Sequence, residues 1–135
     1  MTDSIVQTQS QGQVQRTLSQ QIQKLYKSHI GHAPGKVTCQ ITNNTITFLA
    51  EDSLTKLERL LLKEDKRDDG KSTQVNVEQV RDDLDKALRP ALIEIVQTTL
   101  NLEVVDILSD TTLATGRTAI VVVLSDTPHF KSNDL

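Results

Sequence analysis

The sequence predicts an α+β protein in which a four-stranded antiparallel sheet carries its helices on one face. Two observations support this prediction. Residues 31–58 read in order as a helix end, a strand, a turn, a second strand and the start of a new helix. A similar order returns where a helix that ends near Leu100 is followed by two more strand patterns in residues 102–124. The chain therefore contains two helix–hairpin units, with an extra helix between them.

The first unit opens with a helix after a polar lead-in. Residues 1–12 are rich in Ser, Thr, Gln and Gly and show no apolar periodicity, so we expect a disordered segment there. The apolar positions that follow are spaced for one helical face: Val14, Leu18, Ile22, Leu25 and Ile30. Gly31 ends this helix, because glycine tolerates the left-handed conformation that often follows a helix. Pro34 then prevents the helix from continuing.

Residues 37–49 alternate between apolar and polar side chains, which is the pattern of half-buried strands. The inward positions are Val37, Cys39, Ile41, Ile46 and Phe48. Between the two strands lies the pair Asn43-Asn44, and because asparagine tolerates positive φ the pair predicts a tight hairpin turn.

The next helix has three candidate N-caps, which give two alternative starts. Asp52 or Ser53 is expected to cap a helix that begins near Leu54. If Thr55 is the cap instead, Glu58 lies at the third helical position, and the two residues form a reciprocal capping box. Both alternatives place a helix directly after the first hairpin.

A charged segment, residues 63–74, is predicted as a solvated loop before the longest helix, which begins at Val75. The apolar side of that helix is formed by Val77, Val80, Leu84, Leu88, Leu92 and Ile95. Its acidic residues, Asp82, Asp83 and Asp85, are assigned to the opposite, polar side.

The second strand pair is expected at residues 102–108 and 118–124, with residues 109–116 as the turn. Asp110 would begin this turn, where an Asx-turn is its simplest role. The nearly continuous apolar run 119–124 is typical of a strand covered on both faces, by helices or by a subunit partner. We therefore predict one domain over residues 13–126 and a loose tail over residues 127–135.

Composition excludes several classes of function. The net charge of −3 and the 2% aromatic content disfavour a nucleic-acid-binding surface. The single cysteine leaves no intramolecular disulfide and fits a reducing compartment. Because no apolar run is long enough to span a bilayer or to form a secretory signal, we expect a cytoplasmic protein without direct membrane insertion.

Chemically active residues do not form a recognisable set. His29 and His32 could share a metal ion, but the sequence places no carboxylate near them, and a metal site needs three or four converging ligands. Cys39 is in phase with the buried face of its strand, so it is interpreted as a small hydrophobe rather than a nucleophile. We therefore expect no enzymatic activity, no metal and no cofactor.

The order of short motifs resembles that of small bacterial proteins of the MpsC type. A glycine and a proline precede the first strand, L-T-x-x-E follows the first hairpin, an arginine-bearing helix comes next, and T-G-R precedes a valine-rich strand. The matching residues are Gly31, Pro34, Leu54, Thr55, Glu58, Arg81, Arg89, Pro90, Asp110, Gly116 and Arg117. The resemblance covers residues 14–124. The chain departs from it at residues 31–34, where the family usually has a G-x-G-P entry.

The resemblance implies a soluble accessory component of a membrane-potential-generating, cation-translocating system linked to inorganic-carbon uptake. On that basis we expect a non-enzymatic accessory or regulatory protein that acts through protein contacts, as a homo-oligomer and with subunits of a membrane transport complex. The alternative is a small-ligand or anion sensor, in which Gly31, Pro34, Arg81 and Arg117 converge on one pocket.

Overall fold

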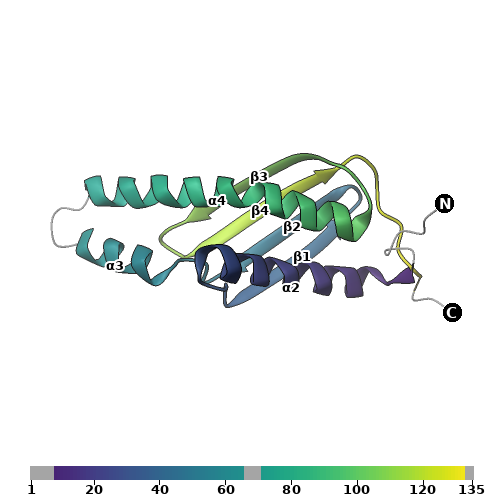
Figure 1. Ribbon diagram of the computed structural model, residues 1–135, viewed down its shortest axis with the longest axis horizontal. Coiled ribbons are helices and arrows are strands. Elements are labelled where there is room, and N and C mark those ends of the chain that lie inside the picture. The colour runs from purple at the N-terminus through teal and green to yellow at the C-terminus, as the bar shows by residue number, and fades with distance from the viewer. Residues whose placement is uncertain (1–7, 66–70, 133–135) are drawn as a thin grey trace.

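The computed structural model describes residues 8–65 and 71–132, and these residues form an α+β structure, as the sequence predicts. The element order is α2 (Gln11–Ile30), β1 (Lys36–Thr42), β2 (Thr45–Glu51), α3 (Lys56–Asp65), α4 (Lys71–Leu100), β3 (Val104–Thr112) and β4 (Arg117–Leu124) (Figure 1). The two helix–hairpin units are thus α2–β1–β2 and α4–β3–β4, and α3 is the extra helix between them.

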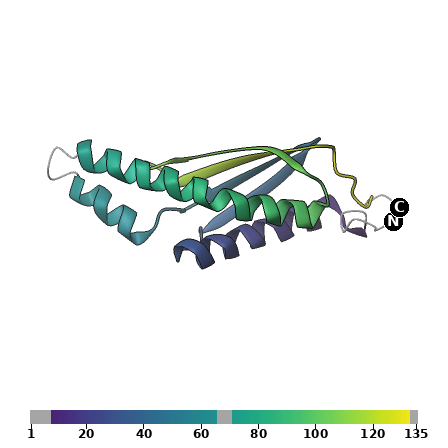
Figure 2. The same cartoon turned by 45° about the horizontal axis from the view of Figure 1, so that its top comes forward.

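The strands form one antiparallel sheet in the order β1-β2-β4-β3. Helix α2 and the C-terminal half of α4 lie on one face of this sheet, and the other face carries no helix among the described residues (Figures 1 and 2). Helix α3 lies beyond the ends of the strands, against the N-terminal half of α4 (Figure 1). The predicted class and the predicted placement of helices on one face are confirmed.

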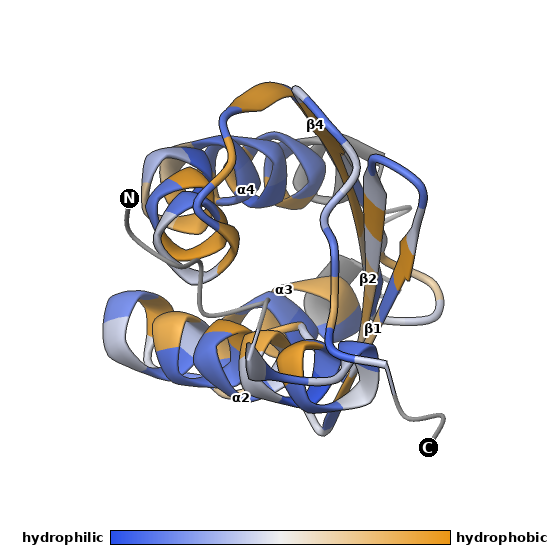
Figure 3. Cartoon of the chain, turned by 90° about the vertical axis from the view of Figure 1, so that its right-hand side faces the viewer, coloured by the Kyte–Doolittle hydropathy of each residue, from blue (hydrophilic) through white to orange (hydrophobic). Residues whose placement is uncertain are grey.

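The hydrophobic core fills the space between the two long helices and the inner face of the sheet. Its fully buried members include Val14, Leu18, Ile22, Phe48, Leu88, Leu92, Val96, Leu100, Ile120 and Val122. Hydrophobic residues occur along the helices and the strands on either side of this layer (Figure 3). Burying each large aliphatic side chain contributes about 1.5–3 kcal/mol, so this layer supplies most of the fold's stability.

The local signals at the first unit act as expected, with one correction. Gly31 is the C-cap of α2 at φ 75°, and Asn43 turns the first hairpin at φ 53°. The helix begins at Gln11, within the predicted lead-in, because Ser10 and Gln13 form a capping box. Apolar periodicity misses a helix start that is fixed by polar caps. The remainder of the predicted lead-in before residue 8 lies outside the described residues.

The charged segment 63–74 is mostly helical, which corrects the prediction of a loop. Helix α3 continues to Asp65 and α4 begins at Lys71, while residues 66–70 lie outside the described part of the chain. Lysine and glutamate are good helix formers, so the loss of apolar periodicity did not mean the loss of helix.

The C-terminal region also differs from its prediction. Strand β3 extends to Thr112, which places Asp110 inside the strand rather than at the start of the turn. In the predicted loose tail, Pro128 is buried, Phe130 packs against the core, and the Lys131 N–H donates to the Gln9 carbonyl at 2.8 Å. The proline and the aromatic ring give this segment enough apolar surface to pack. Residues 133–135 are not described.

Candidate functional site

A buried arginine organises the end of the molecule where α3, α4 and the β3–β4 hairpin meet. Arg81 is only 2% exposed. Its Nε lies 3.3 Å from Glu58 Oε2, and its Nη1 lies 3.6 Å from Asp85 Oδ1. Its Nη2 donates to the carbonyl and, at 3.3 Å, to the hydroxyl of Ser53. One cation thus ties the first hairpin's exit to both α3 and α4.

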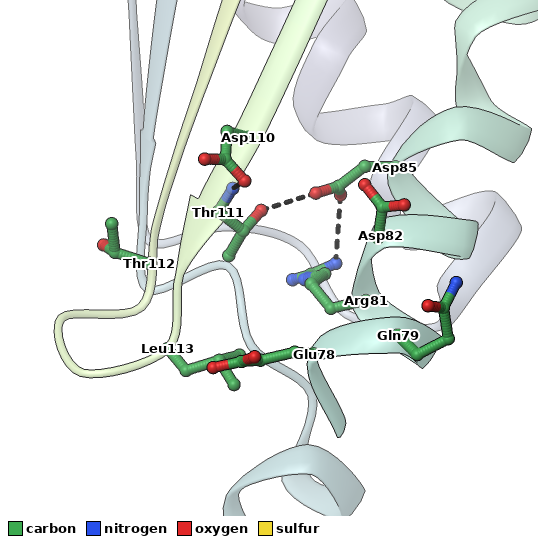
Figure 4. A pocket seen from close by; sticks show the side chains of 9 residues that line it. All are labelled: Glu78, Gln79, Arg81, Asp82, Asp85, Asp110, Thr111, Thr112 and Leu113. Atoms are coloured by element: carbon green, nitrogen blue, oxygen red, sulfur yellow. Dashed lines mark hydrogen bonds and ion pairs between the residues drawn. The ribbon is translucent and has the colours of Figure 1, made fainter. Parts of the chain in front are cut away.

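A chain of hydroxyl groups extends this network to the second hairpin. Thr111 Oγ1 donates to Asp85 Oδ2 at 2.6 Å and lies 2.7 Å from Thr118 Oγ1. Thr118 Oγ1 in turn lies 2.7 Å from Ser53 Oγ, which donates to the Gly116 carbonyl at 3.1 Å. We call Ser53, Glu58, Arg81, Asp85, Thr111 and Thr118 the Arg81 cluster. Figure 4 shows Asp85 between Arg81 and Thr111.

With an ionised Asp85, the hydroxyl groups of this chain have fewer protons than contacts to fill. With an ionised Asp85, Thr111 donates to the carboxylate and Ser53 donates to the Gly116 carbonyl. The single proton of Thr118 must then serve both of its hydroxyl neighbours, one at a time. A proton on Asp85 removes the shortage, because each hydroxyl can then donate to the next one along the chain.

Burial also raises the pKa of Asp85, and the Glu58 and Asp82 carboxylates act in the same direction. The hydrogen bond from Thr111 and the charge of Arg81 act against this shift. Tyr26 of α2 is buried on the same side, and burial, followed by the charge of Asp85, raises the pKa of its phenol. Burial therefore disfavours a net charge in the cluster.

Glu58 connects the cluster with the start of α3. Its backbone N–H donates to Thr55 Oγ1 at 3.2 Å, and its Oε1 accepts from the Thr55 N–H at 2.9 Å. This capping box confirms the Thr55–Glu58 alternative. Asp52 and Ser53 do not cap the helix, because Ser53 faces Arg81 and Asp52 adopts a positive φ of 57°.

The four predicted contact residues do not form one pocket. Gly31 caps α2, and the Pro34 carbonyl accepts a hydrogen bond from Gln23 at 3.3 Å. Arg81 is buried and paired with the carboxylates of Glu58 and Asp85. Arg117 is 54% exposed on the outer sheet face, where its Nε lies 3.5 Å from Glu51 Oε1. Because Thr118 belongs to the inner cluster, strand alternation places its neighbour Arg117 on the opposite face.

Sequence reasoning missed several members of the cluster. Asp85 was assigned to the polar side of its helix, and Ser53 was considered only as a cap. The missed signal is the spacing of the buried side of α4, which is continuous only when charged residues are included: Val77, Arg81, Asp85, Leu88, Leu92, Val96 and Leu100. Thr111 and Thr118 carried no signal, because only the strand register brings them together.

A cleft of about 560 Å³ opens beside the cluster, between α4 and the β3–β4 hairpin. Its lining includes Glu78, Asp82, Asp85 and Asp110, and its one arginine, Arg81, is already paired. The cleft therefore disfavours anions. Within the described residues, no group of three or more His, Cys, Asp and Glu side chains is arranged to hold a metal ion.

A second hollow, of about 300 Å³, lies where the end of α2 meets α3 and α4. We call it the α3–α4 groove, and its lining is mostly apolar: His29, Ile30, Thr55, Leu57, Glu58, Leu61, Val77, Val80 and Leu84. Leu57 and Val80 are 64% and 52% exposed at its rim.

The histidines and the cysteine are engaged separately. His29 Nδ1 lies 3.1 Å from the Leu25 carbonyl, and His32 Nε2 lies 2.8 Å from the Asp52 carbonyl. Burial raises the pKa of the Cys39 thiol to about 12, so the thiolate is scarce at neutral pH. The placement of Cys39 agrees with its interpretation as a buried hydrophobe.

Comparison with known proteins gives a family match. The family model described as "Na+-translocating membrane potential-generating system (MpsC)" matches residues 10–126. No curated protein and no solved structure gives a significant match. In the part of the chain that the structure describes, no helix combines the length and apolar character needed to cross a bilayer. Since the match spans both helix–hairpin units and the Arg81 cluster, the chain belongs to the MpsC family.

Proposed function

We propose that this protein is a non-enzymatic accessory or regulatory component that acts through protein contacts with a membrane cation-transport system. The family description names such a system. A link with inorganic-carbon uptake is the finer expectation that follows from the resemblance. The observation that carries the proposal is the α3–α4 groove, an apolar surface beyond the sheet that the described residues leave open.

The groove has the features of a protein-contact surface. Single exposed apolar side chains are ordinary, but Leu57 and Val80 lie at the rim of one mainly apolar hollow. Its walls come from three helices, an arrangement that accepts the apolar side of an amphipathic helix. A helical segment of a transport subunit is therefore the partner that we propose.

The Arg81 cluster supports this function by fixing the walls of the groove. Glu58 belongs both to the groove and to the cluster, so the pairing with Arg81 holds α3 against α4. A preformed surface loses less conformational entropy on binding than one that must be ordered. The cluster is thus assigned a structural role, and its charges are used within the fold.

The test combines capture with a cellular readout. Tagged wild-type protein, extracted with membranes in mild detergent, should recover subunits of an ion-translocating complex. Leu57→Asp should lose this recovery and lower the membrane potential of cells that depend on the variant, whereas the apolar control Leu57→Met should retain both. Equal recovery by Leu57→Asp and Leu57→Met, with both variants folded, would contradict the assignment of the groove.

The anion-sensor alternative receives little support from the placement of its residues. Arg81 is neutralised by Glu58 and Asp85, and Arg117 lies on the other face of the sheet beside Glu51. Any ligand that binds the native state must raise its melting temperature. We therefore expect no thermal shift with millimolar bicarbonate or phosphate, and a clear shift would revive the sensor hypothesis.

A further inference from the structure

We propose that the uncovered face of the sheet is a homodimer interface, in which β2 of one copy stacks on β4 of a second copy. The two-fold axis lies between the two sheets, runs parallel to the strands and passes between β2 and β4. The face is open along all four strands in the described residues (Figures 2 and 3). This inference does not depend on the proposed transport partner.

The β4 row of the uncovered face is apolar, whereas the outward positions of β1 and β3 include the charged residues Lys36, Asp106 and Asp110. An antiparallel sheet with one solvated face normally alternates apolar and polar residues. Strand β4 instead places Ala119, Val121 and Val123 on its outer face, while Ile120 and Val122 fill the core. The strand register sets two leucines beside this row, since Leu108 of β3 is opposite Val121 and Leu49 of β2 is opposite Ala119. Leu108 is 53% exposed.

Charged residues at one end of the face select a second copy as the occupant. Glu51 of β2 and Arg117 of β4 lie side by side there, with Nε and Oε1 3.5 Å apart. A two-fold rotation about an axis parallel to the strands keeps the same end of each sheet at the same height. It also stacks β2 of one copy on β4 of the second copy. Glu51 of each copy then faces Arg117 of the second copy, and the four charges alternate in sign around the axis.

The other face-to-face arrangement lacks this complementarity. A two-fold axis perpendicular to the strands would stack each strand on the same strand of the second copy, running in the opposite direction. It would set Glu51 over Thr45 and Arg117 over Val123, so both charges would lose water without gaining a partner across the interface. Between these two arrangements, the sign and position of Glu51 and Arg117 therefore favour the axis parallel to the strands.

The available area predicts a weak dimer. Strand spacing and rise give the face an area of about 500 Å², whereas standard interfaces bury about 800 Å² per partner. Aligned sheets also cross at about 30°, which reduces contact at the corners. We therefore expect a monomer–dimer equilibrium that depends on concentration.

Charge complementation between two variants tests the arrangement directly. In sedimentation experiments, Glu51→Arg and Arg117→Glu should each weaken dimerisation by about tenfold or more, because like charges then meet across the axis. An equimolar mixture should form a one-to-one heterodimer, although neither chain regains its own Glu51–Arg117 pair. Failure of the mixture to associate, with both variants folded, would overturn the proposal, as would a wild-type protein that stays monomeric at millimolar concentration.

A second pair of variants distinguishes the sheet face from the α3–α4 groove. Leu108→Lys should weaken dimerisation by about tenfold or more, since the new charge would lose water between β3 and β1 of the second copy. Leu57→Lys, at a more exposed leucine on α3, should leave the dimer unchanged. The reverse result would place the contact between copies on α3 and would overturn the proposal.

Discussion

The two halves of α4 are held in place by different kinds of interaction. Residues 88–100 lie against the sheet and bury Leu88, Leu92, Val96 and Leu100. The half before residue 88 begins beyond the strands and reaches the end of β3, where Asp85 meets Thr111, and its buried side carries Arg81 and Asp85 (Figure 1). One helix therefore continues the same inward side from a hydrophobic layer into an ionic one.

The difference has an energetic consequence. Each aliphatic contact in the hydrophobic layer adds favourable burial, and one deletion removes only its own share. A buried ion pair contributes little net stability, because desolvation offsets attraction, yet removing one partner leaves an uncompensated charge. Replacing all the charged residues of the Arg81 cluster together should therefore cost less stability than removing one of them alone.

The largest expected effect is that of Arg81→Ala. It leaves Glu58 and Asp85 without their cation, and the free energy of unfolding should fall by about 3–5 kcal/mol. Urea denaturation measures this loss. The triple variant Arg81→Met, Glu58→Gln and Asp85→Asn should recover part of it. A cost below about 1 kcal/mol for Arg81→Ala, as for an exposed pair, would mean that the cluster is open to water.

Leu92→Ala examines the hydrophobic half and should cost about 2–5 kcal/mol through lost burial and the cavity left behind. Its matched control is Val80→Ala on the same helix, where the side chain is largely exposed and the cost should stay below about 0.5 kcal/mol. Chemical denaturation of both variants provides the comparison. Equal costs would show that the described burial of α4 is wrong.

A smaller effect is expected from pH. Because burial raises the pKa of Asp85 above its ordinary value of 3.8, the native state binds this proton more readily than the unfolded chain. The stability contributed by Asp85 therefore rises as pH falls through its raised pKa, is complete below 3.8, and is lost as pH rises again.

Comparison with Asp85→Asn isolates this contribution from the other carboxylates, because the asparagine has no proton to bind in this range. The difference in unfolding free energy, wild type minus variant, should increase from neutral pH to pH below 3.8. A difference that decreases in acid would show that Arg81 stabilises the ionised carboxylate more strongly than burial opposes it.

The sequence predicts the hydrophobic half of the comparison far better than the ionic half. Strand alternation, the turn at Asn43 and the helix end at Gly31 are local signals, and the structure confirms each of them. The members of the Arg81 cluster come from α3, α4, β3, β4 and the segment after β2. No short stretch of the sequence therefore contains enough of them to reveal the cluster. Arg81 and Asp85 are spaced i, i+4, but that spacing alone also describes an exposed pair.

A smaller cost than for Arg81→Ala or Leu92→Ala is expected for Thr55→Ala, which lies where the two kinds of interaction meet. The change removes the hydroxyl that accepts from the Glu58 N–H, so the unfolding free energy should fall by about 1 kcal/mol. Glu58 keeps its bond from the Thr55 backbone N–H and its pairing with Arg81, so the cluster should persist. Thr55→Ser restores a hydroxyl and should recover most of the loss in thermal denaturation. A loss as large as that of Arg81→Ala would instead show that the cap holds Glu58 in the cluster, and that the ionic half depends on the first turn of α3.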